Sequence, residues 1–190
     1  IDFIARAKFL HVSGISQAIS ETARAAVFTA IEAARAAKVA VSYDTNLRTR
    51  LWPIETARPA IDKAAALSSL TKTSVEDAET LIGLTDPPAI AAHFLKLGAG
   101  AAIVTLGTRG VHVATPERNV EIRGFEVAAV DATGAGDAFT GALLSELARG
   151  EDLFVAARFA NAAAALSTLG YGAVEPLPRR AAVEAFLAKH

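Results

Sequence analysis

Two aspartates enclose a run of small residues in the segment DATGAGDAF, which spans residues 131–139. Gly134, Ala135 and Gly136 leave their backbone N–H groups unobstructed, and the helical pattern that begins there adds unpaired donors and the positive end of a helix dipole. Such a helix start is suited to binding phosphate oxygens. The same dipole favours the ionised form of Asp137, so the segment predicts an anion site beside a carboxylate.

A carboxylate next to a phosphate pocket can accept a proton from a substrate hydroxyl during phosphoryl transfer. We therefore interpret Asp137 as a general base and the small residues before it as the anion hole of a phosphoryl-transfer site. Other glycine-rich sites fit less well, because the chain lacks the P-loop pattern and GAGDAF lacks the third glycine of a dinucleotide fingerprint. The alternative is an ordinary helix start, in which the glycines form a tight turn and the aspartate is a cap.

Composition narrows the class of protein. The 190 residues are 52% hydrophobic, which is enough for one substantial core and predicts a single domain. A net charge of -1 gives no basic face for a phosphate backbone, so we expect no nucleic-acid partner. Cysteine is absent, which excludes disulfides and thiolate metal sites, and the apolar runs are too short to span a bilayer. We expect no membrane partner and a cytoplasmic location.

Apolar runs and helical patterns alternate along the first hundred residues. The patterns predict strands at 8–15, 39–44, 101–107, 110–115 and 119–127. They predict helices from Ser20, near Pro53, over 74–83, over 88–98 and through most of the chain after Gly134. Pro59 is expected to disturb the first turns of the helix near Pro53.

This alternation predicts an α/β fold with a doubly wound, mainly parallel sheet flanked by helices. In such sheets ligands bind at the carboxyl ends of the strands. We therefore expect one shared crevice formed by three segments: TNLRTR (45–50), TLGTRG (105–110) and DATGAGD (131–137).

The longer string VDATGAGDAFTGAL, residues 130–143, resembles the C-terminal signature of the PfkB family of ribokinase-like carbohydrate kinases. The resemblance extends over essentially the whole chain. It implies a ribokinase-like fold, ATP as the phosphate donor and Mg²⁺ to neutralise the nucleotide phosphates. It also implies that Asp137 is the general base and that the anion hole is formed by Gly134, Ala135 and Gly136.

The resemblance implies further contacts for the nucleotide and for a cation. The ATP-binding residues would be Thr105, Gly107, Arg109, Gly110 and Asn161, the last of them beside the adenine. Asp131 and Thr133 occupy positions that some members use for a monovalent cation, which implies K⁺. One departure concerns Mg²⁺. Where the family usually carries an N-x-x-E motif that organises this ion, the chain has Ser74, Val75, Glu76 and Asp77, which leaves open the side chain responsible.

The segment YDTNLRTRLWP, residues 43–53, follows a predicted strand, where a substrate would lie. Arg48 can bind a carboxylate bidentately, which a neutral sugar does not require. The pattern D-x-N-x-R-x-x-L-W is similar to that of the 2-keto-3-deoxygluconate kinases of the family. That resemblance implies transfer of the γ-phosphate of ATP to the C6 hydroxyl of this acid sugar. Arg48 would hold its carboxylate, with Arg50 close by.

Several alternatives stay open at this stage. The acceptor could instead be fructose, ribose or a nucleoside, and the chain could be a nucleotide-binding fragment without catalysis. Arg48 and Arg50 could pair with surface acids, and Asp44 and Asn46 could simply shape a turn.

Members of the family normally begin with a segment that builds the first strands of the sheet and a small β lid over the sugar. No part of this chain matches that segment. We therefore expect residues 1–190 to be the C-terminal part of a single ribokinase-like kinase domain. Association of copies into a homo-oligomer is left open, because many family members pair through their lids and no part of this chain matches a lid.

Overall fold

The computed structural model describes residues 2–190 and divides into two compact units. The first unit comprises the chain up to Thr105 together with His112–Asn119. The second unit comprises Leu106–Val111 together with Val120–His190.

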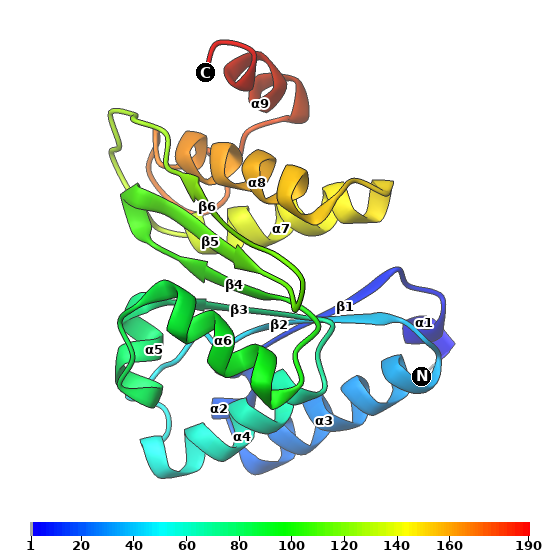
Figure 1. Ribbon diagram of the computed structural model, residues 1–190. Coiled ribbons are helices and arrows are strands. Elements are labelled where there is room, and N and C mark those ends of the chain that lie inside the picture. Colours follow the sequence, from blue (N-terminus) through cyan, green and yellow to red (C-terminus); the bar gives the residue numbers. More distant parts are fainter. Residues whose placement is uncertain (1) are drawn as a thin grey trace. The chain divides into compact units, whose positions relative to one another are not determined.

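Six strands form the sheet, in the order β1-β2-β3-β4-β5-β6 (Figure 1). Their bounds are Phe9–Ser13, Ala40–Asp44, Leu70–Ser74, Ala102–Thr105, Gly110–Ala114 and Asn119–Arg123. The first four strands pair in parallel, and the register places Asp44 opposite both Ser13 and Lys72. The carboxyl ends of these four strands therefore meet at one edge, which confirms the predicted α/β class.

Short turns connect the last three strands. The 3-10 turn Gly107–Arg109 joins β4 to β5, and a turn closed by the Thr115 amide on the Arg118 carbonyl oxygen, at 2.7 Å, joins β5 to β6. Links this short cannot make the crossover that parallel strands need, so β5 and β6 run antiparallel to their neighbours. Gly110 allows the close approach of backbones here, because a Cβ at this position would lie 2.1 Å from the carbonyl oxygen of Ile122.

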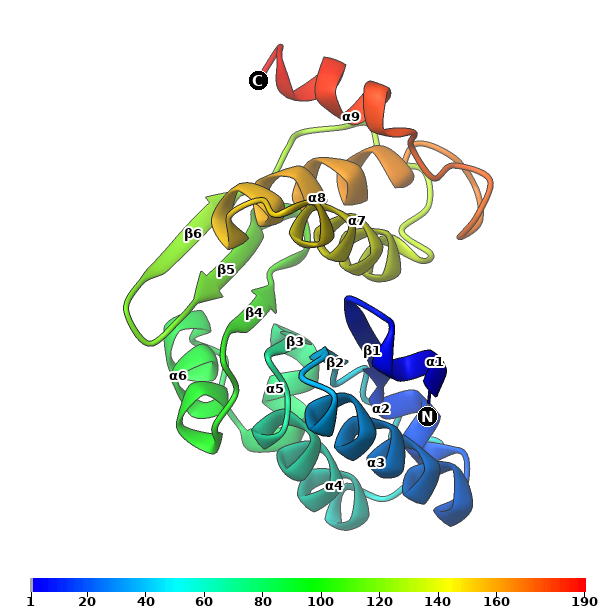
Figure 2. The same ribbon diagram turned by 90° about the vertical axis from the view of Figure 1, so that its right-hand side faces the viewer.

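The first unit contains six helices within the described chain, and two of them begin at the predicted capping residues Ser20 and Ser74. Their bounds are Asp2–Ala5 (α1), Gly14–Ala18 (α2), Glu21–Ala36 (α3), Ile54–Ala66 (α4), Val75–Ile82 (α5) and Pro87–Leu97 (α6). Before α3, the Ser20 side chain accepts a hydrogen bond from the Ala23 amide at 3.0 Å. Before α5, Ser74 caps the helix in the same way, and Gly83 ends it with a left-handed φ of 73°. Figures 1 and 2 show α3, α4 and α6 on one face of the parallel strands.

Several features of the first unit differ from the expectations. The helices α1 and α2 were not predicted, and α2 begins at Gly14, inside the strand expected over 8–15, because β1 ends at Ser13. The helix α4 continues through Pro59, although proline removes one backbone donor from it. Buried residues such as Ile61 and Ala64 hold the helix against its neighbours and offset that loss. The strand β3 was not predicted, because its sequence LTKTS is polar. It is nevertheless buried between β2 and β4, so its neighbours rather than its own pattern make it a strand.

The second unit contains three helices within the described chain: Ala135–Arg149 (α7), Leu153–Ser167 (α8) and Arg180–Leu187 (α9). The helices α7 and α8 lie side by side in Figures 1 and 2, joined by a short link in which Asp152 caps α8 by accepting from the Phe154 amide at 2.8 Å. A core of small and branched side chains, Ala162, Ala163 and Val183, packs against Phe125 and other apolar neighbours. Within residues 2–190, no helix is both long enough and apolar enough to cross a membrane.

Candidate functional site

The helix α7 begins at the glycine-rich turn singled out by the sequence. Gly134 adopts a left-handed φ of 76°, and a Cβ there would lie 2.6 Å from the Cβ of Ala173. Both the backbone conformation and the available space therefore require glycine. No side chain of the described residues caps this helix start, so its first amides are not covered by a protein acceptor of that kind.

The backbone amides of the turn differ in whether they donate to an acceptor within the protein. The Ala135 amide donates to the carbonyl oxygen of Ala132 at 3.1 Å. The amides of Gly134, Gly136 and Asp137 have no acceptor among residues 2–190. The turn thus offers donors for an anion, although the amide of Ala135 already has a partner. The role of Ala135 in an anion hole stays a prediction.

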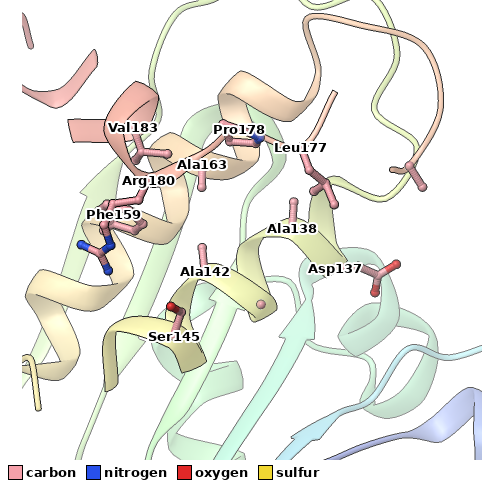
Figure 3. A pocket seen from close by; sticks show the side chains of 12 residues that line it. Asp137, Ala138, Ala142, Ser145, Phe159, Ala163, Leu177, Pro178, Arg180 and Val183 are labelled. Carbon is pink, nitrogen blue, oxygen red and sulfur yellow. The ribbon is translucent and has the colours of Figure 1, made fainter. Parts of the chain in front are cut away.

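The Asp137 side chain is exposed in the first turn of α7 and borders a cavity of about 340 Å³ within the second unit. The cavity lies among α7, α8 and the segment that leads into α9, and its lining is largely apolar: Ala138, Ala142, Phe159, Leu177, Pro178 and Val183 among others. Figure 3 shows Asp137 at one end of this lining. An accessible carboxylate beside unpaired amides can accept a proton from a bound hydroxyl.

Asp131 is held by three hydrogen bonds at the base of the same turn. Its Oδ2 accepts from the Gly172 amide at 2.8 Å, and its Oδ1 accepts from the Thr133 hydroxyl at 2.7 Å and the Thr133 amide at 2.9 Å. These bonds, the one from Gly172 first, lower the pKa of Asp131 below its usual range. The structure therefore brings Asp131 and Thr133 together as an ionised carboxylate and a hydroxyl, which are oxygen ligands suited to a hard cation. Among the described residues, no group of three or more His, Cys, Asp or Glu side chains could hold a metal.

The predicted ATP-binding residues differ in whether they are exposed or already engaged in contacts within the protein. Gly107 has a φ of 61° with open space around it, and Arg109 is exposed. The Thr105 hydroxyl donates to the Thr73 carbonyl oxygen at 3.3 Å, and Gly110 is required by the close approach of β6.

Asn161 is 8% exposed, and its side-chain amide donates to the Arg123 carbonyl oxygen at 2.9 Å. This bond ties α8 to the end of β6. A contact of Asn161 with a nucleotide, like the other predicted ATP contacts, stays a prediction.

In the first unit, the segment after β2 turns at the carboxyl edge of the sheet. Asp44 forms a buried ion pair with Lys72 of β3, and its Oδ1 accepts from the Asn46 amide at 3.2 Å. Asp44 and Asn46 therefore do shape a turn. Arg48 is exposed and donates to the Leu47 carbonyl oxygen at 2.8 Å.

Arg50 is exposed as well. Within residues 2–190 neither Arg48 nor Arg50 forms an ion pair, so the alternative that they pair with surface acids is not what the structure shows. Both guanidinium groups therefore remain available to an anionic ligand.

From the sequence, Asp77 is expected to be the acid of a helix-capping pattern that starts at Ser74, and the last position of a segment that departs from a family motif. In the structure its Oδ2 accepts hydrogen bonds from the Leu47 amide at 2.9 Å and from the Thr45 hydroxyl at 3.1 Å. Burial raises the pKa of Asp77 above its usual value, and these hydrogen bonds partly oppose that shift. The only local sequence signal at Asp77 is the S-x-x-D spacing from Ser74, which predicts a helix cap. This spacing does not predict the contact of Asp77 with Leu47, 30 positions away.

Parallel strands flanked by helices, together with a donor-lined turn at the start of α7, define an α/β protein with a candidate anion-binding site. A family model described as pfkB family carbohydrate kinase matches residues 1–180, and the chain belongs to this family. The predicted resemblance to PfkB kinases is thereby confirmed.

Similar proteins include fructokinases. The fructokinase of Vibrio alginolyticus is 35% identical over 189 residues, which cover 94% of this chain and 60% of the relative. The crystal structure of fructokinase from Vibrio cholerae O395, in its fructose, ADP and calcium ion bound form, is 34% identical with a TM-score of 0.85 over 94% of this chain and 60% of that one. These relatives do not support the finer resemblance to 2-keto-3-deoxygluconate kinases.

A second kind of kinase has the same fold. The aminoimidazole riboside kinase from Salmonella enterica, complexed with aminoimidazole riboside and an ATP analog, is 31% identical with a TM-score of 0.88 over 95% of this chain and 62% of that one. The chain thus spans about 60% of the length of each of these three relatives.

Proposed function

We propose that this chain belongs to an ATP-dependent sugar kinase whose acceptor is the primary hydroxyl of a ketohexose, with fructose as the preferred substrate. The observation that carries the proposal is the exposed Asp137 carboxylate at the start of α7, beside amides that have no acceptor among residues 2–190. Membership of the PfkB family supports phosphoryl transfer, and the fructokinases among the relatives support the sugar.

In the proposed reaction, the amides of Gly136 and Asp137 hold oxygens of the transferring phosphate. The Asp137 carboxylate accepts the proton of the sugar hydroxyl, whose oxygen then bonds to the γ-phosphorus. The bond from that phosphorus to the bridging oxygen breaks, and ADP leaves with the electron pair. The increase in the rate of phosphoryl transfer comes mainly from positioning of the reactants and stabilisation of charge, because the protein itself forms no covalent bond.

Cations complete the proposed site. Mg²⁺ neutralises the charge on the nucleotide phosphates, and we propose that it enters with ATP, since this ion is commonly held by one or two carboxylates together with substrate phosphates. Asp131 and Thr133 are the proposed ligands for K⁺. The depressed pKa of Asp131 keeps an anionic oxygen at that position.

A second acceptor, 2-keto-3-deoxygluconate, is favoured by one specific observation. Arg48 lies at the carboxyl edge of β2, exposed and without an ion-pair partner among the described residues. A guanidinium in that state can bind the carboxylate of an acid sugar. It can equally bind a phosphate, so it does not by itself indicate an acid sugar. For this reason we propose fructose, on which the related fructokinases act, as the preferred acceptor.

A coupled assay of the purified protein with ATP, Mg²⁺ and a panel of fructose, ribose and 2-keto-3-deoxygluconate tests the proposal. We expect the highest kcat/KM with fructose. Highest kcat/KM with the acid sugar, lost in Arg48→Ala, would establish the second acceptor instead. ATP binding without turnover of any sugar would show a nucleotide-binding module and overturn the kinase.

The Asp137→Asn variant tests the proposed base. We expect kcat to fall by about 10²- to 10⁴-fold, the usual contribution of a general base, while ADP binding measured by calorimetry is retained. Asp152→Asn is the matched control, because it makes the same change at the start of α8. Unchanged turnover in Asp137→Asn would remove Asp137 from its proposed role.

A further inference from the structure

The turn that carries Arg48 has a backbone that must be held in place. Asn46 adopts a φ of 35°, in the left-handed region that costs free energy for residues other than glycine. Such a conformation persists only where surrounding groups fix it. Two carboxylates in the first unit contact this turn, Asp44 from its beginning and Asp77 from the start of α5.

Asp77 makes the contacts that cross from one element to another. Its Oδ2 accepts from the Thr45 hydroxyl and from the Leu47 amide, the residue directly before Arg48. Thr45 is 0% and Leu47 6% exposed, so water cannot readily replace the carboxylate. A buried donor that loses its partner pays its full desolvation cost, and the Leu47 amide would be such a donor.

The carboxylate itself is anchored on both sides. Ser74 caps α5 by accepting from the Asp77 amide at 3.0 Å, which fixes the backbone that presents the side chain. The buried pair of Asp44 and Lys72 fixes the other end of the turn, because Asp44 also accepts from the Asn46 amide. The turn is therefore held at Asn46 and at Leu47, and Arg48 leaves it at a defined point.

We infer that Asp77 is a positioning residue, which holds the backbone of Thr45–Leu47 so that Arg48 meets an anionic group of a bound ligand, either a phosphate of the nucleotide or the carboxylate of an acid sugar. This inference rests on the proposed kinase function, in which Arg48 binds the acceptor or the nucleotide. It also assigns a role to the acidic position of the Ser74–Asp77 segment, because the Oδ2 atom of Asp77 accepts the hydrogen bonds that hold the turn. Binding strength, rather than the chemical step, should depend on it.

The experiment compares Asp77→Ala, Arg48→Ala and the double variant with the unmodified protein. Glu79→Gln is the matched control, since it removes one negative charge from the same helix α5 at an exposed side chain outside the Ser74–Asp77 segment. Apparent KM and kcat are measured for ATP and for the best sugar of the panel, and hydrogen–deuterium exchange is measured over residues 45–48.

We expect Asp77→Ala to raise KM for the ligand of Arg48 by about tenfold, with kcat changed less, and Glu79→Gln to stay within about twofold. Because Asp77 acts through Arg48, the double variant should match Arg48→Ala alone instead of adding a second loss. Exchange at the Leu47 amide should accelerate in Asp77→Ala and not in Glu79→Gln.

Independent, additive effects of Asp77→Ala and Arg48→Ala would overturn the inference, as would an increased Mg²⁺ requirement with unchanged KM for both substrates. If Asp77→Ala does not fold, Asp77→Asn takes its place, because it keeps one acceptor oxygen. It should then give a KM between those of the unmodified protein and Arg48→Ala, and a KM equal to that of the unmodified protein would count against the inference. Lack of turnover in the unmodified protein refutes the kinase, whereas the exchange measurement still decides whether Asp77 holds the turn.

Discussion

At the residue scale, Gly134 is required both for the backbone conformation of the turn before α7 and for the anion binding proposed at that turn. Its left-handed φ opens the turn into α7, and the space where a side chain would lie is filled by Ala173. The amides of Gly136 and Asp137, which have no acceptor in the described part of the chain, follow directly, so any shift of Gly134 moves them too. A change at this position should therefore cost stability and anion binding together.

The variant Gly134→Ala is expected to lose about 1–3 kcal/mol of unfolding free energy and at least about tenfold in ADP affinity, because strain and collision both act on the turn. Gly150→Ala is the control for backbone strain alone, since Gly150 has a φ of 95° with no atom near its absent Cβ. Gly141→Ala, in the interior of α7, should instead stabilise by up to about 1 kcal/mol. Urea denaturation and calorimetry measure the two quantities. Equal ADP affinity in Gly134→Ala and Gly150→Ala would contradict the expectation.

At the scale of elements, α9 is attached to α7 and α8 through its first residue. Arg180 forms an ion pair with Glu146 of α7, whose side chain is 7% exposed, and a weaker one with Glu184 at 3.1 Å. Its guanidinium also lies over the ring of Phe159 at 5.0 Å. Together with the buried Val183, these contacts hold the last helix against the pair.

Removing Arg180 should leave the Glu146 carboxylate buried without its partner. We expect Arg180→Ala to lower the unfolding free energy by about 1–3 kcal/mol, less than for a fully buried pair because Arg180 is about a third exposed. Glu184→Gln, which breaks only the exposed pair, should change it by less than about 0.5 kcal/mol. The double change Glu146→Leu with Arg180→Leu should recover most of the loss. Urea denaturation decides, and a loss below about 0.5 kcal/mol in Arg180→Ala would show that the pair contributes little.

The elements that could be predicted are those with local signals. Ser20 and Gly83 mark a helix start and a helix end because capping depends on neighbouring residues only. The strand β3 escaped prediction because Lys72 and its polar neighbours are buried by β2 and β4, which no local pattern reveals. The contact of Asp77 with Leu47 joins residues 30 positions apart, and it depends on the order of strands in the sheet.

At the scale of the whole molecule, the family could be predicted from one turn, whereas the sugar could not. The glycine-rich string has few explanations as an ordinary turn, and it therefore predicted the PfkB family. The family match confirms that prediction. Arg48 suggested an acid sugar, yet the relatives include fructokinases. A guanidinium binds carboxylate and phosphate by the same geometry, so its presence alone does not distinguish the acceptor from the nucleotide.

The two compact units share strands, and this has a consequence for unfolding. β5 contributes Gly110–Val111 to the second unit and the rest of its residues to the first, and β6 is divided after Asn119. Unfolding of one unit would remove part of a strand from the other. We therefore expect a single cooperative transition for the described chain.

Trp52 makes this expectation measurable. It is the only tryptophan of the sequence, it lies in the first unit, and it is 4% exposed, so its fluorescence should change when that unit unfolds. Far-UV circular dichroism follows the helices of both units. We expect the urea transitions from the two probes to coincide, and Arg180→Ala, a change in the second unit, to shift both midpoints equally. A circular dichroism transition that moves while the Trp52 transition stays in place would show that the second unit unfolds independently of the first.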